Sequence, residues 1–335
     1  MNTKNKKRVF AGFCLFCTAI ISLWVFEVYV PHSFSQKTTT VYRVQKGFGE
    51  REISRQLQEQ GLIKQSMFFN LYVMATGNHG ALQAGNYALS PSMSIAKMVK
   101  KFVLGDVVKN NITIIEGWDI EDIAAYLEDK SIYPKKDFFT ASLQDFSIDY
   151  DFLKDKPKTS GLEGYIFPDT YQISAYQSPK ELVQNALNNL DKKLTPDMKK
   201  EIIVQHKSIF QIITMASILE KEVKTLEDKK IVAGILWKRM DSGMPLQVDA
   251  TINYITGKNN RSALIKDTKI DSPYNTYKYT GLPQGPICNP GWDSILAAIY
   301  PKSSPYWYYL SAKKTGTTIF SKTFQEHNLA AYHYL

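Results

Sequence analysis

A single glutamate, Glu220, occupies the position in this sequence that is best suited to acid–base chemistry. It follows an almost wholly apolar run, IFQIITMASIL (209–219), which predicts a buried helix. Burial at the end of such a helix disfavours an ionised carboxylate and favours the protonated acid. A carboxylic acid of this kind can donate a proton to a glycosidic oxygen. The same pattern, an apolar run followed by two glutamates, also fits a structural role in which Glu220 and Glu222 form the polar end of a core helix.

Glu222 lies too far round the same helix to share the site of Glu220. Two residues along a helix correspond to a rotation of about 200°, so the two side chains point in nearly opposite directions. A hydrolase of the two-carboxylate type needs a second Asp or Glu to activate water or to attack the sugar. Glu163 and Asp249 are the candidates that motifs elsewhere in the chain supply, and the sequence does not give their distances from Glu220.

The sequence contains no recognisable metal site or cofactor motif. There is no cysteine cluster, and no paired helical spacing occurs among His32, His79, His206, His327 and His333. The segments SIAK (94–97) and KTG (314–316) match two short motifs of penicillin-recognising serine enzymes, but the S-D-N element between them is missing. We therefore expect neither a metal nor a cofactor.

Six motifs in the second half occur together and in a fixed order. They are LEGYIFPDTY (162–171), ASILEKE (216–222), MPLQVDATINY (244–254), SPYNTY (272–277), GLPQGPICNPG (281–291) and EHN (326–328). The combination resembles the MltG/YceG-like family of endolytic murein transglycosylases. The chain departs from the family pattern at Val248, Ala250 and Cys288, where Thr, Pro and Ala are usual. These departures affect loop packing more than proton chemistry.

The resemblance implies that Glu220, the first glutamate of ASILEKE, is the catalytic residue. A lytic transglycosylase breaks the bond between N-acetylmuramic acid and N-acetylglucosamine without water. Glu220 would protonate the leaving oxygen. As a carboxylate, it would then take the proton of the muramoyl C6 hydroxyl, which attacks C1 and closes a 1,6-anhydro ring. One carboxyl group suffices because the nucleophile belongs to the substrate.

The other motif residues are candidates for sugar binding. Tyrosine rings can stack on pyranose faces, while amides and carboxylates can bond hydroxyl and acetamido groups. Core packing is the alternative for each aromatic ring. The candidate substrate-binding residues are Glu163, Tyr165, Glu222, Gln247, Asp249, Tyr274, Asn275, Tyr277 and Asn289.

An uncharged run near the N-terminus predicts a single membrane span. Residues 9–26 contain neither charge nor proline, and about 18 helical residues extend roughly 27 Å, enough for the hydrocarbon core of a bilayer. The basic residues within 4–8 place the N-terminus in the cytoplasm and the rest of the chain outside, at the cell (inner) membrane. Trp24 and Tyr29 are candidate interfacial anchors. A signal peptide cleaved after residue 35 is the alternative.

An internal repeat at an offset of 70 residues follows a short polar linker. VQKGFGEREISRQLQEQGLI (44–63) aligns with IIEGWDIEDIAAYLEDKSIY (114–133). Each copy reads as a strand, a glycine turn and a helix, and the region resembles the LysM-like part of the family. The expected organisation is a cytoplasmic tail (1–8), a transmembrane anchor (9–30), a linker (31–40), a LysM-like duplicated module (41–155) and a catalytic transglycosylase domain (156–335). The expected fold class is α+β, with a hairpin near the C-terminus.

The formal net charge of +9 on 335 residues admits several anionic partners. The N-terminal tail carries four of these positive charges, which leaves 9 − 4 = +5 for the rest. The predicted location of most of the chain outside the cytoplasm argues against a nucleic-acid partner. The expected partners are peptidoglycan strands, the membrane and a peptidoglycan synthase, and the expected role is termination of glycan elongation. The alternatives are a two-carboxylate muramidase and a non-catalytic wall-binding or division-scaffold protein.

Overall fold

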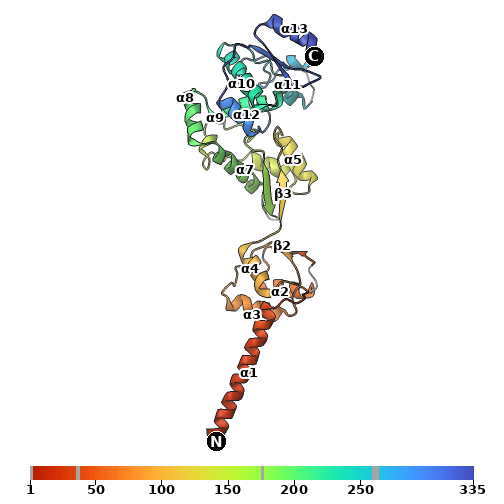
Figure 1. Ribbon diagram of the computed structural model, residues 1–335, viewed down its shortest axis with the longest axis vertical. Helices are drawn as coiled ribbons and strands as arrows, with labels where there is room; N and C mark the ends of the chain where they lie inside the picture. The colour runs from red at the N-terminus through yellow and green to blue at the C-terminus, as the bar shows by residue number, and fades with distance from the viewer. Residues whose placement is uncertain (1–2, 35–37, 175–176, 259–263) are drawn as a thin grey trace. The chain divides into compact units, whose positions relative to one another are not determined.

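The computed structural model describes residues 3–34, 38–174, 177–258 and 264–335, and its mixed α+β fold confirms the expected fold class (Figure 1). The chain forms two compact units. The N-terminal unit comprises Met1–Asn111 with Gln172–Gln177, and the C-terminal unit comprises Ile112–Tyr171 with Ser178–Leu335. Residues 1–2 of the expected tail and 35–37 of the expected linker lie outside the described residues.

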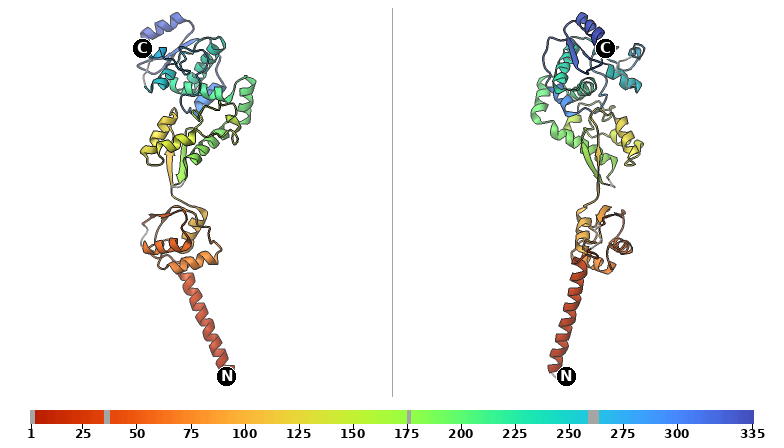
Figure 2. Two further views of the ribbon diagram at one scale, coloured as in Figure 1. Left: turned by 180° about the vertical axis from the view of Figure 1, so that it is seen from behind. Right: turned by 45° about the vertical axis from the view of Figure 1, so that its right-hand side comes forward.

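Helix α1 (Thr3–Tyr29) contains the predicted membrane span. Among the described residues it is the one unbent helix that is long and apolar enough to cross a bilayer, and its candidate span, Gly12–Tyr29, is almost entirely exposed. Figure 2 shows it as one continuous helix whose last turn enters the N-terminal unit. There Val28 is fully buried, so the end of the helix is part of that unit's core.

The N-terminal unit combines a two-stranded sheet with three short helices. Strand β1 pairs antiparallel with β2, in a register that runs from Thr40↔Leu89 to Val44↔Gly85. The core is aromatic, and the Phe102 ring meets the Tyr87 ring edge to face at 4.7 Å. The elements, in chain order, are β1 (Thr40–Val44), α2 (Glu50–Glu59), α3 (Ser66–Ala75), β2 (Gly85–Leu89) and α4 (Ile95–Leu104).

The second copy of the repeat has the same strand–helix–helix–strand order. It consists of β3 (Lys109–Thr113), α5 (Ile120–Asp129), α6 (Lys135–Ser142) and, after the 3₁₀ turn η1 (Asp151–Leu153), β4 (Thr170–Ser174), which pairs with β3. Helices α2 and α5 have the same length and lie 70 residues apart (120 − 50), which confirms the predicted repeat at the level of elements. The glycine turn also recurs, because Gly47 and Gly117 both have positive φ angles.

The division between the units differs from the expected boundary near residue 155. It passes through the paired strands β3 and β4, so most of the second copy belongs to the C-terminal unit. The physical reason is a set of long-range hydrogen bonds. Gly117 N–H donates to the Asn289 carbonyl at 2.9 Å, and Asn289 N–H donates to the Trp118 carbonyl at 2.8 Å. The second copy therefore helps to build the larger core rather than a separate module.

The rest of the C-terminal unit is mainly helical. Helix α9 packs against α8, α10, α11 and α12 and lies at its centre. Strands β5 (Tyr308–Ser311) and β6 (Thr318–Ser321) pair antiparallel and confirm the predicted hairpin. The helices are α7 (Pro179–Lys193), α8 (Pro196–Val204), α9 (Ile209–Glu222), α10 (Leu226–Asp241), α11 (Asp249–Thr256), α12 (Trp292–Ile299) and α13 (Phe324–Tyr334), with a 3₁₀ turn η2 (Asp267–Lys269).

Helix α9 is the buried helix that the apolar run predicted. A capping box fixes its start, because Ser208 and Gln211 exchange side-chain and backbone hydrogen bonds. Every residue from Ile212 to Leu219 is buried. The last turn of α9 therefore delivers Glu220 to the edge of the core of this unit.

Candidate active site

Three hydrogen-bond donors surround the Glu220 carboxylate. Lys229 Nζ lies 3.2 Å from Oε2, Ser294 Oγ donates to Oε2 at 2.6 Å, and the Gly291 N–H donates to Oε2 at 3.0 Å. All three reach the same oxygen, and no hydrogen bond from the described residues reaches Oε1. The carboxylate is thus fixed through Oε2, and Oε1 is left available for a proton transfer.

The structure adds polar partners that the apolar run preceding Glu220 did not reveal. Only 11% of the Glu220 side chain and 5% of the Lys229 side chain are exposed, so the two form a nearly buried ion pair. The Lys229 ammonium, the Ser294 hydroxyl and the Gly291 N–H thus give this carboxyl group polar partners inside the fold. Lys229 is in the first turn of α10, which begins four residues after α9 ends.

Helix α12 supplies the other two donors. Gly291 is its N-cap residue and Ser294 is in its first turn, so the N-terminus of the helix points at Glu220. The free N–H groups and partial positive charge of a helix N-terminus stabilise an anion. The pairing of α9 with α12 is therefore what gives Glu220 its environment.

A second carboxylate, Glu116, lies at the same helix end. A Cβ atom at Gly291 would be 2.2 Å from the Glu116 carboxyl carbon, so the Glu116 side chain lies directly against this glycine and would have to shift for any larger residue. The Trp292 N–H donates to Glu116, and burial followed by the charge of Glu220 raises the pKa of Glu116. Glu116 and Glu220 thus bind consecutive N–H groups of α12.

Sequence reasoning missed Glu116, Lys229 and Ser294. For Glu116 a signal did exist within the repeat, because Lys46 stands at the equivalent position of the first copy (116 − 46 = 70). The two copies thus carry opposite charges beside the glycine that they share. The adjacent Gly117 has φ +81°, and a Cβ there would lie 3.6 Å from Glu220 Cγ, so this turn packs directly on the glutamate.

Glu163 forms a second polar cluster in this unit. Its Oε2 accepts the Ile120 N–H at 3.0 Å, and its Oε1 accepts Asn289 Nδ2 at 3.1 Å. Burial by the surrounding protein raises the pKa of Glu163 to about 8, against the lowering effect of the backbone donors. Burial, and after it the charge of Glu163, raises the pKa of Tyr274, whose ring packs on the Tyr254 ring at 5.0 Å.

Glu222 belongs to a third cluster, apart from Glu220. Tyr309 Oη donates to it at 3.0 Å, and burial raises the pKa of Glu222 to about 7, with Asp249 adding to the rise. Tyr277 Oη donates to Asp249 Oδ1 at 2.5 Å. The structure therefore brings together three of the predicted binding residues, Glu222, Asp249 and Tyr277, around the start of α11.

The comparisons with known proteins cover almost the whole chain. The model of the YceG-like family matches residues 42–333.

The chain belongs to the YceG-like family.

Three relatives show how far the similarity of this YceG-like chain extends. A Bacillus subtilis (strain 168) protein named endolytic murein transglycosylase is 34% identical over 317 residues, which cover 91% of this chain and 87% of that protein. A protein of the same name from Streptococcus pneumoniae serotype 2 is 29% identical, and the match covers 91% of this chain and 60% of that protein. The crystal structure of a YceG-like protein from Listeria monocytogenes matches with a TM-score of 0.60 and 33% identity, over 88% of this chain and 99% of that one.

Three of the predicted binding residues are enclosed in this YceG-like fold. Tyr165 is 0% exposed and stacks on Phe152, with ring centroids 6.1 Å apart. Asn275 donates to the carbonyls of Thr268 and Ile270 and so shapes its own loop. Asn289 is also fully buried. It accepts the Ile166 N–H and donates to Trp118 and Glu163. Packing and internal hydrogen bonds involve all three side chains, in agreement with the structural alternative, and their contact with sugar stays a prediction.

Gln247 and Tyr274 are among the predicted residues that remain accessible to a ligand. Gln247 is exposed and has φ +52°, a left-handed conformation that is costly for a residue other than glycine. Its N–H donates to the Thr276 carbonyl, which fixes the turn before α11. Tyr274 is only partly buried, and its hydroxyl lies 3.2 Å from a Cβ built on Gly285.

The raised pKa of Glu163 predicts a pH dependence of stability. The pKa is 4.5 in an unfolded chain and about 8 in the fold, so the native state holds this proton more strongly. The contribution to stability is fully present below about pH 4.5 and is lost as the pH rises through about 8. Urea unfolding at a series of pH values should show this fall. In Glu163→Gln it should be smaller by a few kcal/mol.

The pH profiles of the wild type and of Glu163→Gln are compared to isolate the contribution of Glu163. Glu222, with a pKa of about 7, contributes a fall in the same direction, so the Glu163→Gln variant keeps part of the dependence. Parallel pH profiles for the wild type and Glu163→Gln would show that Glu163 is ionised in the fold throughout this range.

Proposed function

We propose that this chain is an endolytic murein transglycosylase, which cleaves the MurNAc–GlcNAc bond within glycan strands and leaves a 1,6-anhydro-MurNAc end. The observation that carries the proposal is the Glu220 carboxylate, which is held by three donors on Oε2 and free of them on Oε1. Relatives named endolytic murein transglycosylase that align along 91% of the chain support it.

In the proposed first step, Glu220 gives a proton to the glycosidic oxygen as the bond from that oxygen to C1 of the muramoyl residue breaks. Negative charge develops on Glu220 as the proton leaves. Lys229, Ser294 and the Gly291 N–H are already in place around Oε2 and stabilise that charge without reorganising. The donors are thus more effective in the transition state than in the protonated ground state, as catalysis requires.

In the second step, the ionised Glu220 takes the proton of the C6 hydroxyl, whose oxygen bonds to C1. One bond to C1 is broken and one is formed, and the proton returns to Glu220, so the cycle needs no water and no cofactor. Glu116 assists by position. Burial and then the charge of Glu220 raise the pKa of Glu116, so this second carboxyl group holds its proton more readily than an exposed one.

A muramidase that uses water is the second candidate, because Glu116 provides a second carboxyl group near Glu220. In such enzymes the two groups flank the scissile bond on opposite sides. Here Glu116 and Glu220 bind neighbouring N–H groups of the same helix end. That shared attachment favours the transglycosylase over the hydrolase.

The N-terminal half is proposed to bring the catalytic part to the murein of the cell wall. Its β1-α2-α3-β2 order supports a LysM-like module that binds murein strands, with residues 41–155 as the duplicated region and 156–335 as the catalytic part. Helix α1 would anchor the chain in the cell membrane as a single span, with the N-terminus in the cytoplasm and the catalytic part outside. A peptidoglycan synthase is the proposed partner, and termination of glycan elongation the proposed role.

Product end-groups test the proposed function. Purified murein glycan is digested with the full chain, and the products are weighed by mass spectrometry. We expect new ends that carry 1,6-anhydro-MurNAc, in fragments from within the strands. Reducing ends would support the muramidase. Intact strands, with a folded protein by circular dichroism, would support a non-catalytic wall-binding or scaffold protein.

A further inference from the structure

Helix α3 is apolar on both of its sides, which is unusual for a helix at a protein surface. Its sequence, SMFFNLYVMA, contains no charged residue. Phe68, Phe69 and Val73 are buried in the N-terminal unit, whereas Met67, Leu71 and Met74 are 55%, 39% and 68% exposed. A helix that is apolar all round requires a second apolar environment besides the core.

The membrane span ends directly against this helix. The Tyr72 ring of α3 lies 6.0 Å from the Tyr29 ring and 6.3 Å from the Trp24 ring, and both of these residues belong to the candidate span Gly12–Tyr29. Trp24 and Tyr29 are five residues apart, which corresponds to about 7.5 Å of helix axis and matches the depth of the headgroup layer. Within the N-terminal unit, α3 is thus fixed at the level where the span leaves the bilayer.

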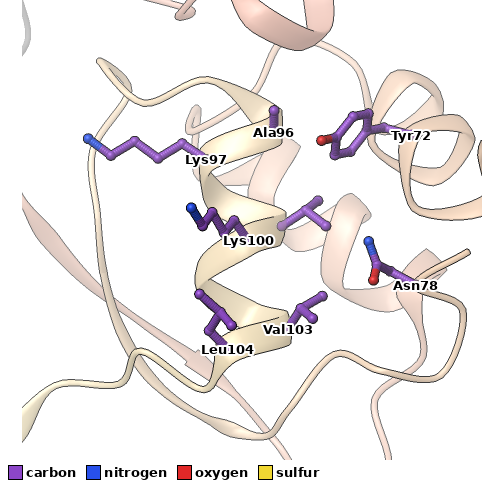
Figure 3. Close-up of a pocket in the computed structure, with 8 residues that line it drawn as sticks. Tyr72, Asn78, Ala96, Lys97, Lys100, Val103 and Leu104 are labelled. Carbon is purple, nitrogen blue, oxygen red and sulfur yellow. The ribbon is translucent and has the colours of Figure 1, made fainter. Parts of the chain in front are cut away.

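A groove of about 400 Å³ opens between α3 and α4 next to these rings. Figure 3 shows Ala96 and Val103 of α4 turned toward Tyr72 and Asn78, with Lys97 and Lys100 on the same helix. Neither lysine forms a salt bridge with a described residue. The residues that line the groove therefore include apolar side chains and two lysines, whose amino groups leave α4 on the side away from Tyr72 (Figure 3).

We propose that the exposed apolar side chains of α3 (Met67, Leu71 and Met74) and the two lysines of α4 (Lys97 and Lys100), together the α3–α4 face, lie in the membrane surface and bind an anionic phospholipid. The apolar side chains of α3 enter the boundary between headgroups and acyl chains, and the lysines of α4 bind headgroup phosphate. The proposal rests on the membrane anchor of the proposed function and is independent of the glycan chemistry. Lipid binding at this face would add a second attachment of the N-terminal unit to the bilayer, besides helix α1.

Photo-crosslinking in defined vesicles tests the proposal. The full chain with Met74→benzoylphenylalanine is reconstituted into vesicles of phosphatidylcholine, alone or mixed with phosphatidylglycerol, and irradiated. We expect lipid adducts at position 74, with phosphatidylglycerol enriched several-fold over its share of the mixture. The control is Val41→benzoylphenylalanine, since Val41 is 63% exposed on β1 of the same unit, and it should give no lipid adduct.

Two lysine variants separate the charge from the apolar contact. Lys97→Glu with Lys100→Glu should abolish the preference for phosphatidylglycerol and keep adducts with phosphatidylcholine, whereas Lys97→Arg with Lys100→Arg should keep the preference. Equal lipid adducts at positions 41 and 74, or none at 74, would overturn the proposal. Adducts to protein at position 74 would assign the face to a second copy of the chain. Glycan cleavage is measured on the same samples, so active vesicles without adducts refute this inference alone.

Discussion

Glu220→Gln is expected to lower the rate at which 1,6-anhydro ends form by about 10²- to 10⁴-fold. Glutamine has nearly the same shape as glutamic acid, so Ser294 and Gly291 can still donate to its carbonyl oxygen. It cannot release a proton to the glycosidic oxygen, and its amide cannot accept one from the C6 hydroxyl. Both steps of the proposed cycle are therefore blocked by a change of very few atoms.

The fold should survive this substitution. Lys229 loses its main partner, but Glu116 lies at the same helix end, and the charge of Lys229 already lowers the pKa of Glu116. Mass spectrometry of glycan digests gives the rate, and urea unfolding gives the stability. The matched control is Glu227→Gln on the exposed start of α10, which should cleave at the wild-type rate. Wild-type turnover by Glu220→Gln would transfer the acid role to Glu116, with Glu116→Gln as the next variant.

The helix that carries Glu220 could be predicted because the information is local. A run that is apolar on all sides can only be a core helix, and a glutamate that ends it must lie at the edge of the core. The partners of Glu220 could not be predicted in the same way. Ser294 is 74 residues away in the chain and Gly291 is 71 residues away, so only the packing of α9 on α12 brings them together.

The candidate binding residues, too, could not be assigned a role without the long-range packing of the fold. Tyr165 and Tyr277 both occur in motifs that combine proline with aromatic residues, yet one is fully buried and the other bonds Asp249 at the start of α11. Residue type and spacing cannot separate these outcomes, because burial of a loop aromatic depends on which helices pack over it. The repeat, too, could be predicted only in part. Its two copies were visible in the sequence, but their division between two units depends on hydrogen bonds to Asn289.

Lys229→Met is expected to destabilise the protein by about 3–5 kcal/mol, because it leaves the Glu220 charge nearly buried beside an apolar side chain. Urea unfolding followed by tryptophan fluorescence measures this loss. Lys230→Met is the matched control at the next residue. Lys230 is 30% exposed and pairs with the exposed Glu227 at 3.7 Å, so its loss should cost at most about 1 kcal/mol. Equal effects of the two substitutions would show that Lys229 and Glu220 do not interact as an ion pair.

The double variant Lys229→Met with Glu220→Gln separates charge from packing. If the cost of the single change comes from an unpaired carboxylate, then removing that charge as well restores much of the stability, and the two effects are not additive. The cleavage rate of Lys229→Met carries independent information. We expect it to fall by about 10²- to 10³-fold even where the variant is fully folded, since the charge that develops on Glu220 has lost its strongest donor. A folded Lys229→Met variant with the wild-type rate would mean that the ammonium serves stability alone, and that α12 by itself stabilises the carboxylate during the reaction.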